Sequence, residues 1–205
     1  MEDYRHAAVA LTGDFNPAIF HPEWFRQHEI LPDIEVKSAE ATTDLLISHQ
    51  VTVIKFLSLR IEVLGERWTI ASERADWFKD LGPITASIFR NLPHTPVKAL
   101  SINFSEHRLA PIAPTEVMKA WISGSTFGTM IGDNSKIGLI GRATWEGYDA
   151  TVVLEHSLHL KNGLFSLQSY EKKLKTAKDI DTIKWADVLA RSNKISSELL
   201  GLSKS

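Results

Sequence analysis

The sequence contains no cysteine. This absence excludes thiol nucleophiles, thiolate zinc sites, iron–sulfur clusters and disulfides together. Residues 1–5 are acidic and lack an apolar core of signal-peptide length. No apolar run approaches the roughly 18 residues that a membrane span needs. We therefore expect a cytoplasmic protein without a membrane partner.

The common catalytic and ligand-binding motifs are also missing. The chain has no glycine-rich phosphate loop followed by Lys-Ser/Thr, no Gly-x-Ser-x-Gly turn around a nucleophile, and no His-Glu-x-x-His zinc motif. The ligand spacing of a calcium-binding EF-hand is absent as well. We therefore expect neither a metal nor a cofactor.

Net charge is low, because 23 Lys and Arg face 25 Asp and Glu and leave a formal charge of −2. Such a chain has no strong field to attract nucleic acid or an anionic membrane. Lys172, Lys173, Lys175 and Lys178 form a basic C-terminal segment with no aromatic side chain between them for base stacking. We expect no specific nucleic-acid binding, and a nucleic-acid accessory role through this segment stays open as an alternative.

The chain has 205 residues, of which 43% are hydrophobic and 23% charged. These values are typical of a folded protein, and the length predicts a single domain over residues 1–205. Alternating or β-branched segments predict strands at 6–12, 51–56, 59–63, 67–71, 97–104, 137–145, 148–160 and 164–172. Turns are predicted at Gly65-Glu66, Glu146-Gly147 and Asn162-Gly163.

Apolar residues at intervals of three and four predict helices at 77–92, 115–122 and 182–200, and Pro22 opens a short one. Trp185, Val188 and Leu189 begin the apolar stripe of the last helix, and Gly201 suits its end. The order predicts the α+β class, with a largely antiparallel sheet of meanders packed by a central helix and a C-terminal amphipathic helix. A meander followed by a helix occurs twice.

Phe20, Trp24 and Phe25 lie in an aromatic loop stiffened by Pro17 and Pro22. Large aromatic side chains anchor many protein interfaces, so these three are the predicted partner-binding residues, with at least one of them exposed. Burial of all three in the core is the alternative, because aromatic side chains dominate cores as well.

Three residues are weak candidates for catalysis. His94 lies in a stiff turn between two prolines, His107 follows a predicted strand, and Asp14 lies in the kink before the aromatic loop. A histidine paired with a carboxylate from another segment is the usual equipment for general acid–base chemistry. The spacing of His156 and His159 does not suit a shared metal on a strand, since residues three apart face opposite sides.

The segments FNPAIFHPEWF (residues 15–25) and LPHTPVKALSINF (residues 92–104) resemble an uncharacterised family of bacterial proteins of about this length. The resemblance extends over the first half of the chain, to about residue 110, and implies a bacterial cytoplasmic origin. It implies no activity and no site residue.

We therefore expect a non-enzymatic binding or assembly module of a bacterial cytoplasmic complex, acting on a protein partner or forming a homo-oligomer. An enzyme of unrecognised class that uses a histidine and a carboxylate is the main alternative. A catalytic pocket would bring a buried histidine and a carboxylate together, whereas a binding module would expose a contact surface.

Overall fold

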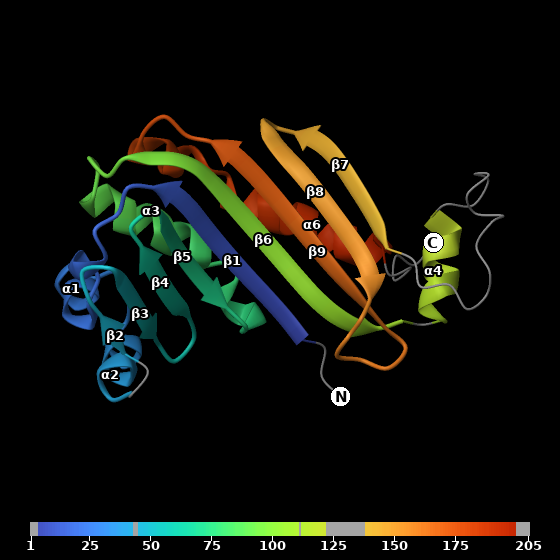
Figure 1. The fold of residues 1–205 in the computed structure, drawn as a ribbon, viewed down its shortest axis with the longest axis horizontal. Helices are drawn as coiled ribbons and strands as arrows, with labels where there is room; N and C mark the ends of the chain where they lie inside the picture. The colour runs from blue at the N-terminus through green and yellow to red at the C-terminus, as the bar shows by residue number, and fades with distance from the viewer. Residues whose placement is uncertain (1–3, 43–44, 111, 122–137, 200–205) are drawn as a thin grey trace.

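A computed structural model describes residues 4–42, 45–110, 112–121 and 138–199. Within these residues, nine strands form one sheet in the order β2-β3-β4-β5-β1-β6-β9-β8-β7, and every neighbouring pair is antiparallel (Figure 1). The predicted α+β class with a largely antiparallel sheet is confirmed.

The elements follow one another along the chain in two runs. The first run contains β1 (Tyr4–Gly13), α1 (Pro22–Gln27), α2 (Asp33–Glu40), β2 (Leu46–Ile47), β3 (Val51–Lys55), β4 (Arg60–Leu64), β5 (Arg67–Ser72) and α3 (Leu81–Asn91). The second contains β6 (Val97–Leu109), α4 (Pro114–Trp121), β7 (Leu139–Trp145), β8 (Tyr148–His156), β9 (Gly163–Lys173) and α6 (Trp185–Leu199). Short 3₁₀ helices lie at Pro17–Ile19, Ala75–Trp77 and Ala177–Thr182.

The two runs share one topology. In each, the first strand pairs with the last strand of a three-stranded meander, and a helix follows: β1 pairs with β5 before α3, and β6 pairs with β9 before α6. The two first strands, β1 and β6, pair with each other at the centre of the sheet. Apart from β2, the strand order therefore has the same pattern in both directions from the centre.

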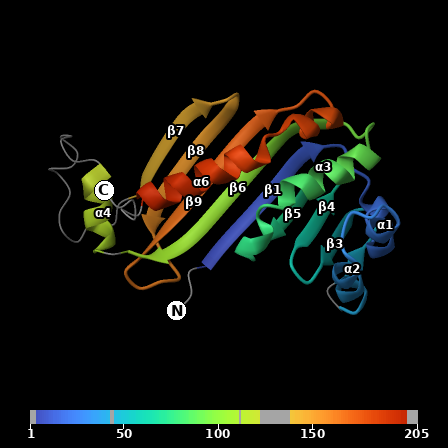
Figure 2. The same ribbon diagram turned by 180° about the vertical axis from the view of Figure 1, so that it is seen from behind.

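Helices α3 and α6 cover the same face of the sheet (Figure 2). Alternate side chains of the central strands, such as Val9, Leu11 and Ile102, point toward these helices and are at most 1% exposed. One hydrophobic cluster contains residues from both runs, from Ala7 to Val188. We call the opposite side of the sheet the open face, because no described helix lies in front of it in Figure 1.

Two predicted boundaries were wrong. Helix α3 begins at Leu81, between the predicted start at 77 and the alternative start at Pro83, since Pro83 is tolerated in the first turn but not deeper in a helix. Strand β6 continues to Leu109, five residues beyond the predicted end. Its hydrophobic alternation ends at Glu106, a buried carboxylate paired with Arg5 at 3.4 Å and Arg108 at 3.1 Å.

Helix α2 was not predicted at all. The pattern of apolar residues in its sequence does not mark the buried side of the helix. The apolar Ile34 is 63% exposed, whereas the charged Glu35 is 1% exposed. The predicted Glu146-Gly147 turn is present, with φ of 47° and 80° at the two residues. The β8–β9 connection is longer than the predicted two-residue turn and runs over residues 157–162, with Asn162 in the left-handed region at φ 59°.

Helix α6 confirms the predicted amphipathic pattern in part. Trp185 and Val188 are buried, whereas Leu189 is half-buried at the margin of the stripe. The predicted helix end at Gly201 lies outside the described residues. Over the described part of the chain, no helix combines the length and the apolar content that a membrane span requires.

Candidate functional site

The three predicted partner-binding aromatics lie in the core. Phe20, Trp24 and Phe25 are 1%, 8% and 0% exposed, and their rings contact one another edge to face or tilted. Phe25 also packs against Phe56 of the β3–β4 connection. The expectation that at least one of the three is exposed is wrong, because all three rings pack into the main hydrophobic cluster. A partner contact through these rings stays a prediction, and it would require the loop to open.

The weak catalytic candidates are not brought together with His107. Asp14 and His94 are both exposed, on adjacent loops joined by the bond from the Asp14 N–H to the Pro96 carbonyl at 2.9 Å. His107 lies near the other end of β6, about 30 Å away at the rise of an extended strand. The pairing of His107 with Asp14 is therefore excluded.

His107 belongs instead to a cluster of rings with His159 and Phe165, next to the β8–β9 connection. Its Nδ1 lies 2.9 Å from the Ser157 hydroxyl, which also accepts the backbone N–H groups of His159 and Leu160. Because these two N–H groups occupy the acceptor sites of the hydroxyl, we assign its proton to His107 Nδ1. Burial, and then the charge of His159, lower the pKa of His107. The cluster therefore favours a neutral imidazole.

The basic C-terminal segment does not form a continuous basic face. Lys173, Lys175 and Lys178 are exposed, whereas Lys172 lies over the ring of Tyr148 at 5.2 Å. The Asp179 carboxylate sits within the segment and accepts the N–H groups of Lys175 and Thr176. These two bonds hold the pKa of Asp179 below its usual range.

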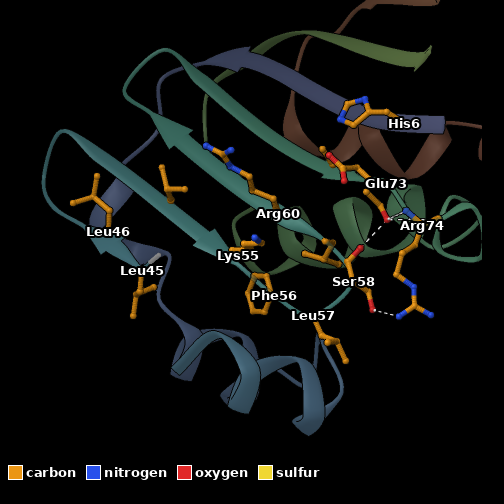
Figure 3. A pocket seen from close by; sticks show the side chains of 14 residues that line it. His6, Leu45, Leu46, Lys55, Phe56, Leu57, Ser58, Arg60, Glu73 and Arg74 are labelled. Carbon is orange, nitrogen blue, oxygen red and sulfur yellow. Dashed lines mark hydrogen bonds between the residues drawn. The ribbon is translucent and has the colours of Figure 1, made fainter. Parts of the chain in front are cut away.

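A hollow of about 770 Å³ opens on the open face, over the ends of β3, β4, β5 and β1 (Figure 3). Its volume lies within the range of small-ligand pockets. The apolar lining comes from Leu45, Leu46, Val53, Phe56, Leu57, Leu59 and Ala71. The polar lining comes from His6, Lys55, Ser58, Arg60, Ser72, Glu73 and Arg74.

A buried network fixes the wall formed by the β3–β4 connection. The carboxylate of Glu35 in α2 accepts the backbone N–H of Ser58 at 3.0 Å. The hydroxyl of Ser72 donates to the Ser58 carbonyl at 2.7 Å, and Arg74 donates to the Ser58 hydroxyl at 3.3 Å. Glu35 is therefore a positioning residue, since its hydrogen bond holds the connection against α2, while the Ser72 hydroxyl holds it against the end of β5.

The hollow also brings a histidine and a carboxylate onto one surface. His6 projects from β1 and Glu73 follows β5 (Figure 3). Burial lowers the pKa of His6, and the negative charge of Glu73 opposes part of that shift. The pair was not predicted from the sequence, because its members are 67 positions apart.

The middle of the open face consists of small side chains. Ala71, Ala8, Asn103, Ser169 and Thr151 follow one another in register across β5, β1, β6, β9 and β8. Lys55 and Arg60 continue this row at one end, and Arg142 continues it at the other. The alternation of buried residues with more exposed ones in β4 and β5 is the pattern that indicates such a face.

In the described part of the chain, no group of three or more His, Asp or Glu side chains is placed to hold a metal ion. No protein family model matches the chain, and no curated protein sequence matches it either.

Proposed function

We propose that the chain is a non-enzymatic binding or assembly module, and that the open face is its contact surface. The observation that supports this proposal is the row of small side chains across β5, β1, β6, β9 and β8. The resemblance of residues 15–25 and 92–104 to bacterial proteins, together with the lack of cysteine, supports a place in a bacterial cytoplasm.

Small side chains are an unusual cover for the middle of a sheet. Alanine is depleted in strands, because a β-branched or aromatic residue packs better on a pleated surface. Ala10, Ala71 and Ala99 nevertheless lie on the open face and are half-buried among neighbouring side chains. A surface of this kind has low relief and allows the backbone of a partner to approach closely.

Charge on the open face favours a protein partner over nucleic acid. The open face carries both signs of charge: the positive side chains are Lys55, Arg60, Arg67, Arg142 and Lys173, and the negative ones are Glu62, Glu73, Asp149, Glu155 and Glu171. Five positive side chains thus meet five negative ones, and the face presents no continuous basic surface to a phosphate backbone. Mixed charges of this kind set the register and specificity of a protein contact.

A photo-crosslinking side chain at Asn103 tests the proposal. Asn103 lies in the small row of the central strand β6 and bonds only to Ser101 in the described structure. The variant is expressed in a bacterium that carries the gene, and irradiation is expected to give a discrete adduct, either with one partner protein or with a second copy of the chain.

Lys194 is the matched control position, because it lies on α6 on the helix-covered side with a side chain that is 76% exposed. The same crosslinker at Lys194 is expected to give no such adduct. Equal adducts at both positions, or none at Asn103, would overturn the contact role of the open face.

A further inference from the structure

The two edges of the sheet differ in how they end. At one edge, β2 is only two residues long and pairs with β3. At the other edge, β7 runs for seven residues, and no described strand pairs with its outer side (Figure 1). Because the two runs share one topology, β7 corresponds to β3. The place that β2 fills in the first run is therefore open in the second, over the described part of the chain.

Strand β7 has few of the features that protect an edge strand from pairing. Proteins usually protect a long edge with a proline, several charges or a bulge. β7 contains no proline, its one charged residue is Arg142, and its register with β8 is unbroken. All five residues from 140 to 144 are exposed, and Ile140 is 61% exposed. The strand is therefore accessible along its length.

The turn after β7 determines which backbone groups point outward. Residues 146–147 both have positive φ, as in a two-residue type I′ turn. The residues on either side of such a turn, Trp145 and Tyr148, form a hydrogen-bonded pair. Bonded and non-bonded pairs alternate along an antiparallel ladder. The residues of β7 that present N–H and C=O groups outward are therefore Ile140, Arg142 and Thr144.

We propose that the outer edge of β7 binds β7 of a second copy of this chain, antiparallel to it, about a two-fold axis at Ala143. An antiparallel edge is complementary to itself, so one surface supplies both sides of the contact. The two sheets become one, with the helices of both copies on the same face. This edge does not include Asn103, so the proposal does not depend on the contact role of the open face.

Charge favours Ala143 as the centre of the pairing. In this register Arg142 is opposite Thr144 of the second copy, and Asp149, which pairs with Thr144 in the β7–β8 hairpin, lies one strand further. The guanidinium group thus faces an opposite charge across a small side chain. A centre at Arg142 itself would place two arginines directly opposite each other, which is destabilising.

The side chains on the helix-covered face fit the same register. Trp145 is half-buried, stacked on Tyr148 and beneath Arg191 at 4.7 Å, so its indole is held in place at the edge. Gly141 of the second copy is opposite this indole and adds no side chain, and an aromatic ring opposite a glycine is a favourable pair at a sheet edge. At the axis, two alanines meet and allow close approach.

The lack of cysteine makes the pairing directly testable, because one introduced thiol forms a disulfide only between two copies. Across the axis the residues at 143 are a non-hydrogen-bonded pair, with Cα atoms about 4.5 Å apart, which suits a disulfide. Ala190, an exposed alanine on α6, is the matched control. Under mild oxidation, Ala143→Cys is expected to form the linked dimer at least about tenfold faster than Ala190→Cys. Equal rates would overturn the proposal.

Arg142→Pro and Arg142→Gln separate backbone pairing from charge. Proline at 142 removes an N–H group that points outward and keeps the bonds to β8, so the hairpin tolerates it. Circular dichroism checks that both variants are folded. By sedimentation velocity over a concentration series, the unaltered chain is expected to dimerise, and proline is expected to weaken dimerisation at least about tenfold more than glutamine.

Three outcomes would overturn the pairing of β7: a chain that stays monomeric throughout the series, an equal effect of proline and glutamine, or dimers that persist in Arg142→Pro. Persisting dimers that also crosslink at Asn103 would belong to the open face, so failure of the β7 contact is distinguishable from failure of the proposed function.

Discussion

The His107 imidazole makes the stability of the chain depend on pH. Burial and His159 lower the pKa of His107 in the folded chain below its ordinary value of about 6.5. Folding therefore favours the neutral ring, and its contribution is complete above pH 6.5 and lost as the pH falls through the folded-state pKa. We predict that His107→Gln makes the loss of unfolding free energy between pH 7 and pH 5 less steep, as measured by urea denaturation at each pH.

Ser157→Ala provides a second test of the same bond. It removes the hydroxyl that donates to His107 Nδ1, so protonation of the ring becomes less costly and the pH dependence also becomes less steep. His6 contributes in the same direction, because burial lowers its pKa despite the opposing charge of Glu73. A slope in His107→Gln equal to that of the unaltered chain would show that the depressed pKa does not belong to His107.

Buried carboxylates account for much of what the sequence did not predict. Glu35 and Glu106 are 1% and 4% exposed, and each has specific partners from distant segments. A hydrophobicity pattern treats such a residue as a surface position, so helix α2 was missed and β6 was ended too early. The partners that make burial tolerable become visible only in three dimensions.

Single elements were predicted well where their local pattern is strong. In strands β3, β4 and β5, successive side chains alternate between the core and the open face. The predicted tight turns at Gly65-Glu66 and Glu146-Gly147 both connect paired strands. The hollow is different, because its side chains come from β1, β2, β3, β4, β5 and three connections. No local spacing relates His6 to Arg60 or Arg74, so the site required the sheet topology.

The contact between α3 and α6 depends on a residue without a side chain. A Cβ added to Gly82 in the first turn of α3 would lie 2.4 to 2.8 Å from side-chain atoms of Trp185 in α6. Trp185 cannot simply move, since its Nε1 donates to the Phe78 carbonyl at 2.9 Å in a buried position. The two helices are therefore packed through Gly82.

We predict that Gly82→Ala lowers the free energy of unfolding by about 1–3 kcal/mol, the usual cost of overpacking, even though alanine favours a helix. Gly65→Ala is the control, because nothing lies within 4 Å of its added Cβ. Chemical denaturation of both variants checks the difference. A Gly82→Ala chain as stable as the Gly65→Ala chain would show that the two helices separate easily.

At the scale of the whole molecule, the repeated topology does not divide the chain into two independent halves. The β1–β6 pair joins the two runs through ten residue pairs, from Tyr4↔His107 to Gly13↔Val97. The main hydrophobic cluster is continuous across this pair, with Val9 and Leu11 of one run and Ile102 and Tyr170 of the other. If the two runs came apart at residue 97, the side chains in the middle of this continuous cluster would be exposed to water.

We therefore predict that the chain unfolds in a single cooperative transition, as the single domain expected from the sequence requires. The calorimetric and van't Hoff enthalpies should agree, and far-UV circular dichroism should change together with tryptophan fluorescence. Fluorescence samples both runs, because Trp24 and Trp68 are buried in the first and Trp185 in the second. Replacing Trp121, Trp145 and Trp185 with phenylalanine leaves tryptophans in the first run alone, and the fluorescence midpoint of this variant should match its midpoint by circular dichroism. Two separate transitions, or a midpoint for the first run that differs from that of the whole chain, would show that the repeated topology marks two domains with separate stabilities rather than one.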